Sequence, residues 1–414
     1  MRVAERNNRD CCNRLFGMQN KYTYMMRTLP DIGEQLKTLD KSIDDSLLVA
    51  LFNGRNLNEE ERILVSLPTR LGGLGIRIPS EVSSAQYENS VGITRQLTEH
   101  IVLQKEKLDI NNEIIKDIIQ EAKSRKEESN KVQFEKAINA SNEIHARIIQ
   151  ATTEKGASAW LNALPMKTKD YHLSKVEFWD ALYLRYGFRI SGLPTTCACG
   201  NPYSISHSLT CLKGGYVTMR HNILRDTTAD LLTITSKDVQ IEPILTKLTG
   251  EELRYKTGKV EDDARVDVSA RNFWRFGDKV FLDIRIFNPI ADTHLKKSLK
   301  EAHEANEQEK KRQYNDRIQN VEHGFFTPLV FSCFGGMSHE CKMFFKHITN
   351  LIADKRNETY QNVTRWIKTK ISFALLKVAL ICLRGYRGKF KEKECVLDEN
   401  ISKDIRDCIR EAEP

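Results

Sequence analysis

Apolar and polar residues alternate in three short segments of the second half of the chain. Residues 239–245, 266–270 and 280–287 follow a period of two and are rich in branched side chains, which predicts three strands. An apolar run at 327–332, followed by a glycine pair, predicts a fourth strand. Apolar residues at helical spacing predict helices over 217–233, 295–321, 339–353 and 361–384. The order α-β-β-β-α-β-α is typical of helices packed on a mixed sheet.

The first half of the chain shows helical patterning. Residues 1–100 predict several helices, with breaks at Pro30 and in the glycine-rich turn at 67–76. Residues 101–156 are charged and lack proline and glycine as far as residue 150, which predicts one long exposed helix as a connector, or a partly disordered segment. Residues 157–192 predict a further helical block with aromatic residues that pack in the core.

Composition limits the function only weakly. The 414 residues are enough for about two to four domains, with 29% charged and 40% hydrophobic residues. The net charge of +8 permits a polyanionic partner, and basic residues concentrate between 365 and 393. No secretory signal is visible, and the longest apolar run, 371–383, is too short to cross a bilayer. We therefore predict an intracellular chain with free thiols and no membrane partner.

Three cysteines and a histidine have the spacing C-x-C-x7-H-x3-C. They are Cys197, Cys199, His207 and Cys211. Thiolate and imidazole ligands suit Zn²⁺, and four protein ligands close a structural site. The surrounding loop is polar, so little besides a metal would hold it together. The sequence therefore predicts a zinc knuckle, and the alternative is a chance gathering of these residues in one loop.

Two aspartates lie on consecutive predicted strands. Asp267 and Asp283 each have apolar neighbours on both sides, where a carboxylate is costly unless it has a partner or faces a cleft. A hairpin would bring both carboxylates to one Mg²⁺ or Mn²⁺ ion, which is the arrangement that phosphodiester hydrolysis requires. Glu242 is a weaker third candidate. The alternative is that both aspartates lie at strand ends and point to solvent.

A cation near these carboxylates would stabilise negative charge on an attacked phosphate. The second residue after Asp283 is Arg285, which cannot act as a general base because arginine stays protonated, so we assign it to DNA contacts. The helix predicted at 295–321 offers Lys310, or less favourably Lys311, followed by Tyr314. Such a charged helix can also be no more than a solvated surface.

A basic triplet follows the knuckle at the start of the helix predicted over 217–233. It consists of Arg220, His221 and Asn222. Side chains at the first turns of a helix, beside a zinc module, are placed to contact DNA phosphates. We therefore predict that these three residues bind DNA, whereas a histidine in such a place can also be structural.

Together these motifs resemble the C-terminal part of non-LTR (LINE-type) retrotransposon proteins, in the subgroup that carries a restriction-enzyme-like endonuclease. In that family a C-x-C…H…C knuckle precedes an Arg-His-Asn helix, two aspartate strands, and a helix with lysine and tyrosine. The resemblance covers about residues 150–340, although Val266 stands where the family often has proline, and the spacing between the aspartates is slightly long. Residues 20–75 also resemble the thumb region that follows the reverse-transcriptase fingers and palm.

The resemblance implies roles for the candidate residues and a multidomain fold of the α+β or α/β class. Asp267 and Asp283 would bind catalytic Mg²⁺ or Mn²⁺, with Lys310 and Tyr314 as further catalytic residues. The implied domains are a thumb-like helical region (1–100), a charged connector (101–156), a helical linker (157–192), the zinc knuckle (193–215), a restriction-endonuclease-like core with a mixed sheet (216–355) and a basic helical tail (356–414).

The function implied is a metal-dependent DNA endonuclease that nicks target DNA to prime reverse transcription. Its partners would be target DNA, the element RNA and the reverse-transcriptase core of a longer protein, and its location would be the nucleus, with a cytoplasmic ribonucleoprotein stage. The chain has no Tyr-x-Asp-Asp motif, so we do not expect it to copy RNA by itself. Two alternatives remain: a catalytically inactive zinc-containing nucleic-acid-binding remnant, and a polymerase accessory scaffold whose first 190 residues bind RNA.

Overall fold

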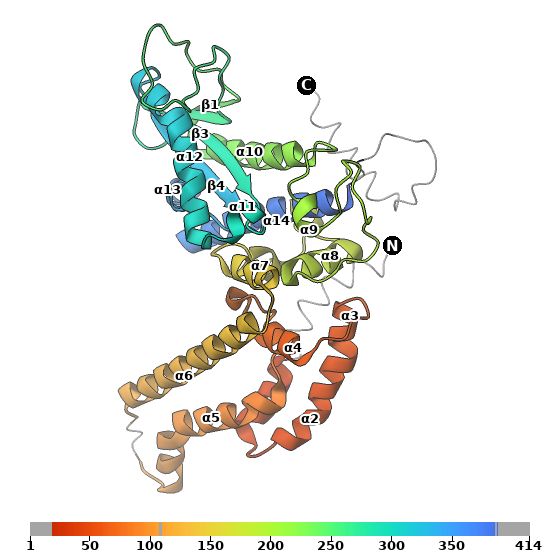
Figure 1. Ribbon diagram of the computed structural model, residues 1–414. Coiled ribbons are helices and arrows are strands. Elements are labelled where there is room, and N and C mark those ends of the chain that lie inside the picture. The colour runs from red at the N-terminus through yellow and green to blue at the C-terminus, as the bar shows by residue number, and fades with distance from the viewer. Residues whose placement is uncertain (1–18, 107–109, 386, 388–414) are drawn as a thin grey trace.

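The computed structural model describes residues 19–106, 110–385 and 387. Helices make up the N-terminal part, and a four-stranded sheet with its covering helices makes up the C-terminal part (Figure 1). The chain is therefore a mixed α and β protein, as the sequence predicted. Within the described residues, no helix is long and apolar enough to span a membrane.

The N-terminal part consists of helices joined by short turns. They are α2 (Gly33–Ser42), a π-helical turn (Ile43–Leu48), α3 (Val49–Leu51), α4 (Glu59–Ser66), α5 (Pro79–Val102) and α6 (Asn112–Asn139). The glycine-rich turn after α4 is a tight connection, as predicted, because a Cβ on Gly73 would lie 1.9 Å from the carbonyl oxygen of Leu67. Figure 1 shows α5 and α6 extending away from the rest of the molecule.

The prediction of a single helix over 101–150 is wrong. The segment contains the end of α5, all of α6 and most of α7 (Glu143–Thr153). The Asn111 side chain accepts hydrogen bonds from the first turn of α6, and the Asn142 side chain accepts one from the backbone of His145 in α7. Asparagine N-caps of this kind start new helices without proline or glycine.

Residues 157–190 are less helical than predicted. They form two short 3-10 turns, Ala159–Asn162 and Lys167–Lys169, before α8 (Lys175–Tyr186). A capping box formed by Ser174 and Glu177 starts α8. The aromatic residues Trp160 and Tyr186 are buried in the largest core cluster, so the prediction of core packing is confirmed for these two residues, whereas Trp179 is only partly buried.

The sheet has the order β1-β2-β3-β4 and is mixed. The strands are β1 (Lys237–Ile241), β2 (Val268–Arg271), β3 (Lys279–Phe287) and β4 (Phe325–Ser332). The first three strands are antiparallel neighbours, while β3 and β4 are parallel. The strand predicted at 239–245 ends earlier, because Glu242 has a positive φ of 49° and Pro243 has no N–H to pair.

Helices cover both faces of the sheet. The remaining helices are α9 (Ile205–Ser208), α10 (Tyr216–Thr235), α11 (Asp292–Leu295), α12 (Leu299–Asn320), α13 (His339–Arg356) and α14 (Tyr360–Arg384). Leu282 of β3 belongs to a core cluster with residues of α10, α13 and α14. Its neighbour Phe281 belongs to a second cluster with Ile318 of α12. Alternate residues of β3 therefore face different helical layers, and α10 and α12 lie on opposite sides of the strand (Figure 1).

Helix α14 is part of the core and does not form a separate basic tail. Its first half packs against the sheet through Ile367 and Ile371. Its second half packs in the core of the N-terminal part through Val378 and Leu383. The Arg384 guanidinium forms an ion pair with Asp180 at 2.7 Å, so this basic residue is already neutralised. The predicted tail beyond this helix lies, apart from Gly385 and Arg387, outside the described residues.

A long loop separates β1 from β2. Arg317 of α12 is fully buried beneath it. The guanidinium donates hydrogen bonds of 2.8–2.9 Å to the carbonyl oxygens of Thr246, Lys259 and Glu261. One arginine thus holds this loop against α12, beside the start of β2.

Candidate metal centre and carboxylate site

The four predicted zinc ligands meet in one place. The Sγ and imidazole nitrogen atoms of Cys197, Cys199, His207 and Cys211 all lie within 4.8 Å of one another. The Sγ atoms of Cys197 and Cys211 are 3.7 Å apart, and the Sγ of Cys199 is 3.3 Å from Nε2 of His207. In a tetrahedral zinc site, two sulfurs are separated by about 3.8 Å, and a sulfur and a nitrogen by about 3.6 Å. The group could therefore hold a metal ion such as zinc.

Local backbone geometry presents these four ligands. Gly200, with φ of 91°, turns the chain directly after Cys199, so that its N–H bonds to the carbonyl of Cys197. The Ser204 side chain accepts a hydrogen bond from the backbone of His207 and caps α9. The N–H of Cys211 then bonds to the carbonyl of His207 at 2.8 Å.

The knuckle is attached to the C-terminal end of α14. The Tyr203 hydroxyl donates to the carbonyl oxygen of Leu383 at 2.6 Å, and Arg387 donates to Tyr203 and to the carbonyl of Ser208. On another side, Asn288, directly after β3, donates to Ser206 at 3.1 Å. The knuckle therefore has a defined orientation relative to the sheet.

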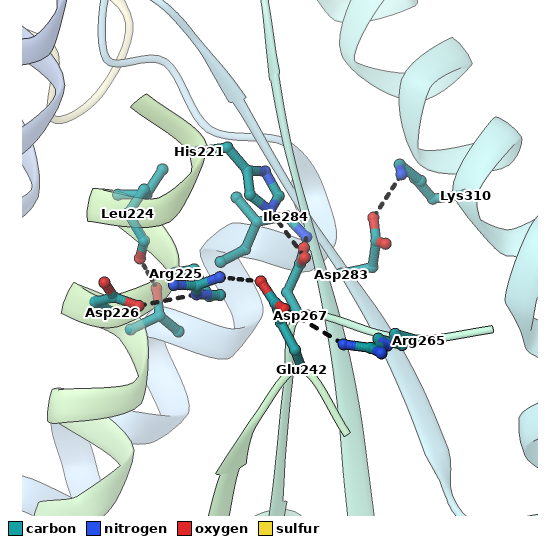
Figure 2. Close-up of polar contacts among 11 residues, drawn as sticks. His221, Leu224, Arg225, Asp226, Glu242, Arg265, Asp267, Asp283, Ile284 and Lys310 are labelled. Atoms are coloured by element: carbon teal, nitrogen blue, oxygen red, sulfur yellow. Dashed lines mark hydrogen bonds and ion pairs between the residues drawn. The ribbon is translucent and has the colours of Figure 1, made fainter. Parts of the chain in front are cut away.

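The two predicted catalytic aspartates lie on neighbouring strands. Asp267 directly precedes β2, at the point where β2 stops pairing with β3. Its carboxylate accepts a hydrogen bond of 2.5 Å from the backbone N–H of Ile284. The carboxylate thus takes the place of a backbone carbonyl as the partner of this N–H. Figure 2 shows the carboxylates of Asp267 and Asp283 beside each other, with His221 approaching from α10 and Lys310 from α12.

Lys310 is the lysine that reaches the carboxylates. Its Nζ lies 2.7 Å from Oδ2 of Asp283, and both side chains are largely buried. Lys311, the less favoured candidate, instead pairs with Glu340 of α13 at 2.7 Å. Burial raises the pKa of Asp283 to about 6, and the nearby negative charge of Asp267 acts in the same direction, while Lys310 opposes the shift. A cation at this place would favour the charged carboxylate.

His221 contacts the carboxylate site in this structure. Its Nε2 lies 2.8 Å from Oδ1 of Asp267, across 46 positions of the sequence. The hydrogen bond with Asp267 raises the pKa of His221 above its usual value. His221 is therefore placed to orient the carboxylate of Asp267, and DNA contact by His221 stays a prediction.

The other predicted DNA-binding residues lie in different environments. Arg220 is 4% exposed and donates to the carbonyl oxygen of Ile286, so the expected phosphate contact from Arg220 is not supported. Asn222 is partly exposed on α10. Arg285 of β3 is partly exposed and lies 3.4 Å from Glu309 of α12. DNA contacts by Asn222 and Arg285 remain predictions.

Tyr314 is a buried neighbour of the carboxylates. It is 7% exposed, belongs to the cluster between α12 and the sheet, and packs on the ring of Phe326. Burial raises its pKa, and the negative charge of Asp283 raises it further. A hydroxyl with a raised pKa stays protonated, so Tyr314 can donate a hydrogen bond but is unsuited to act as a base.

Arg225 is a residue that the sequence reasoning missed. It forms ion pairs with Glu242 and with Asp226 on its own helix. Glu242, the weaker carboxylate candidate, thus lies beside α10, and Arg265 approaches it at 3.9 Å (Figure 2). Because residues four apart share one face of a helix, the position of Arg225 after His221 was a signal that both side chains face the sheet.

Comparisons with known proteins do not assign the chain to a family. No protein-family model matches the chain, and no curated protein matches it. Within the described residues, the one group of three or more closely spaced Cys, His, Asp or Glu ligands is the Cys₃His group of the knuckle. The structure therefore defines a mixed α and β protein with a candidate metal centre and, apart from it, a pair of neighbouring carboxylates, of which Asp283 is buried and Asp267 is partly buried.

The raised pKa of Asp283 predicts a pH-dependent stability difference between the wild type and Asp283→Asn. A carboxyl whose pKa is raised in the folded state stabilises the fold at low pH, and this stability is lost as pH rises from about 4 through about 6. In magnesium-free buffer, we expect the free energy of unfolding of the wild type, relative to the variant, to fall between pH 5 and pH 7. Urea unfolding at several pH values measures this difference, and a difference independent of pH contradicts the prediction.

Proposed function

We propose that this chain is a metal-dependent DNA endonuclease. The observation that carries the proposal is the pairing of Lys310 with Asp283 at 2.7 Å, on a strand beside Asp267. Two carboxylates from the central strands of a mixed sheet, or directly beside them, together with a lysine are the groups that phosphodiester hydrolysis requires. The family resemblance of the sequence supports the same activity.

Each residue of the carboxylate site would have a separate role in the reaction. Carboxylate oxygens are the ligands that Mg²⁺ and Mn²⁺ prefer, so Asp267 and Asp283 suit such an ion. When bound, the ion would supply charge neutralisation at the phosphate and would lower the pKa of a water molecule. Lys310 has three N–H donors, so it can retain Asp283 and also bond to a phosphate oxygen. His221 would hold Asp267 in orientation through its 2.8 Å contact.

The wider role proposed follows the resemblance to non-LTR retrotransposon proteins. The endonuclease would nick target DNA in the nucleus, and the resulting 3′-hydroxyl would prime reverse transcription of the element RNA by a reverse-transcriptase core. The knuckle, which could hold zinc, lies at the start of α10, the helix that carries His221 and Asn222. It would therefore help to position DNA over the carboxylates.

A plasmid assay tests the endonuclease proposal. We expect the purified, zinc-loaded protein to convert supercoiled plasmid to nicked circles with Mg²⁺ or Mn²⁺. Without added Mg²⁺ or Mn²⁺, in metal-depleted buffer that leaves the zinc bound, we expect no conversion. Nicking that persists without added Mg²⁺ or Mn²⁺ would contradict a metal-dependent mechanism.

A second candidate is a nucleic-acid-binding protein without catalysis. It is favoured by one observation: Asp267 already bonds to His221 and Ile284, and Asp283 to Lys310, so both carboxylates have partners without a metal. This candidate predicts salt-dependent DNA binding by a zinc-loaded protein that does not nick plasmid.

A further inference from the structure

The turn between β2 and β3 has a defined conformation. The N–H of Asn272 bonds to the carbonyl of Asp278 at 2.9 Å, and the Asn272 side chain accepts a hydrogen bond from the N–H of Gly277 at 2.7 Å. Asn272 and Gly277 both have positive φ, of 62° and 89°, which suits asparagine and glycine. The turn is therefore closed by its own hydrogen bonds.

Two aromatic residues anchor this turn to the protein. Phe273 is 2% exposed and stacks on Phe344 of α13. Trp274 stacks on His347 and donates a hydrogen bond to Thr327 at 3.2 Å. The backbone just before the tip is thus held by contacts with one strand, β4, and one helix, α13.

The tip itself presents an unburied phenylalanine. Phe276 is 95% exposed, the most exposed of the large apolar residues described in this structure. An exposed phenylalanine forgoes the free energy of burial, so a partner that covers this ring would gain it.

The charge around the ring is mainly basic. Residues 271–279 contain Arg271, Arg275 and Lys279 against a single acidic residue, Asp278. Arg275 is exposed, and its guanidinium lies 5.4 Å from the centre of the Phe325 ring. In the part of the chain that the structure describes, no ion pair joins Arg275 to a carboxylate. Arg271 lies 3.4 Å from Asp238, and the Nζ of Lys279 lies over the ring of Phe281, so Arg275 is the exposed basic residue nearest to Phe276 in sequence that could contact an anionic partner.

We propose that the turn at 271–279 binds DNA, with Phe276 stacking on an unpaired base and Arg275 contacting the neighbouring phosphate. An aromatic face beside a cation is the arrangement by which proteins bind single-stranded nucleic acid, because every base has a π face. A paired base would first have to be unstacked, at a cost of a few kcal/mol, so the ring favours unpaired strand.

The position of the turn relative to the carboxylates adds detail to the proposed function. The inference rests on that function in one respect, the choice of DNA as the nucleic acid. Lys279 and Asp283 are four residues apart on β3, which is about 13 Å along a strand. A DNA strand held at the carboxylates would therefore reach the turn within a few nucleotides. The turn would therefore distinguish single-stranded from double-stranded DNA beside the nick.

Binding without added Mg²⁺ or Mn²⁺ tests this inference separately from nicking. We would measure fluorescence anisotropy of the zinc-loaded protein, in buffer with no added Mg²⁺ or Mn²⁺ and no chelator, with a labelled single-stranded 20-mer of mixed sequence and with its blunt duplex. We expect Phe276→Ala to weaken single-strand binding about tenfold and duplex binding less than threefold. Tyr24→Ala is the matched control, since Tyr24 is an aromatic residue that is 71% exposed on another part of the molecule.

Two further variants separate stacking from charge. Phe276→Trp should retain binding, and the single strand should quench its added tryptophan emission because the ring stacks on a base. Arg275→Gln should reduce the slope of log K against log salt by about one. The inference is overturned if Phe276→Ala binds single strands as tightly as Tyr24→Ala, if both DNAs are weakened equally, or if the Trp variant shows no quenching. Loss of plasmid nicking by the wild type, with these binding results intact, would reject the endonuclease alone.

Discussion

Replacing Asp283 by asparagine is expected to reduce plasmid nicking by at least about 100-fold, with a similar loss for Asp267→Asn. Asparagine is nearly isosteric with aspartate but carries no charge, so it binds a divalent ion weakly. In Asp283→Asn, Lys310 also loses its carboxylate partner at 2.7 Å. The measurement is the initial rate of conversion of supercoiled plasmid to nicked circles in Mg²⁺.

Asp230→Asn is the matched control for these variants. Asp230 is exposed on α10, the helix that carries His221, and pairs loosely with Lys370 at 3.4 Å. We expect this control to nick at the wild-type rate, while all three variants keep the wild-type circular dichroism spectrum. Nicking that survives in both carboxylate variants would remove these residues from the reaction and favour the non-catalytic alternative.

Removing the metal from the knuckle is expected to have the largest effect on stability. Structural zinc contributes apparent binding free energies of about 10 kcal/mol or more, and this energy is lost when a ligand is removed. We expect Cys211→Ser to release the bound zinc and lower the thermal midpoint of the chain. The knuckle bonds to α14 through Tyr203, so its unfolding also disturbs the end of that helix.

Zinc content by atomic emission and thermal unfolding by circular dichroism measure these effects together. Cys382→Ser is the matched control, because Cys382 is a buried cysteine next to the knuckle but outside the ligand group. We expect it to keep one zinc ion per chain. Equal zinc content in Cys211→Ser and the wild type would show that the four ligands do not form the metal site.

Local sequence patterns predicted most elements of the second half. The alternation around Leu282 and Ile284 predicted β3, and helical spacing predicted α10 and α12, because these signals depend on neighbours within one or two turns. The first half was predicted less well. The caps at Asn111 and Asn142 were read as ordinary helix residues, although asparagine often starts a helix.

The carboxylate site was predicted in part. The sequence selected Asp267, Asp283 and Lys310, and the structure brings them together. It favoured Lys310 but kept Lys311 as an alternative, since adjacent helical residues point about 100° apart and the rotation of α12 against the sheet decides which one faces Asp283. For the same reason it assigned His221 to DNA, whereas the packing of α10 turns it to Asp267.

The sequence by itself determined the ligand set of the knuckle, because its four residues lie within 15 positions and their spacing alone limits how they can meet. It also determined the strands, through alternation that any sheet would require. Only the tertiary structure decided that α14 is core, that Arg220 is buried and that Phe276 is exposed. These outcomes depend on the surface against which each helix or strand packs. Such contacts join residues far apart in the chain and produce no periodic pattern in the sequence.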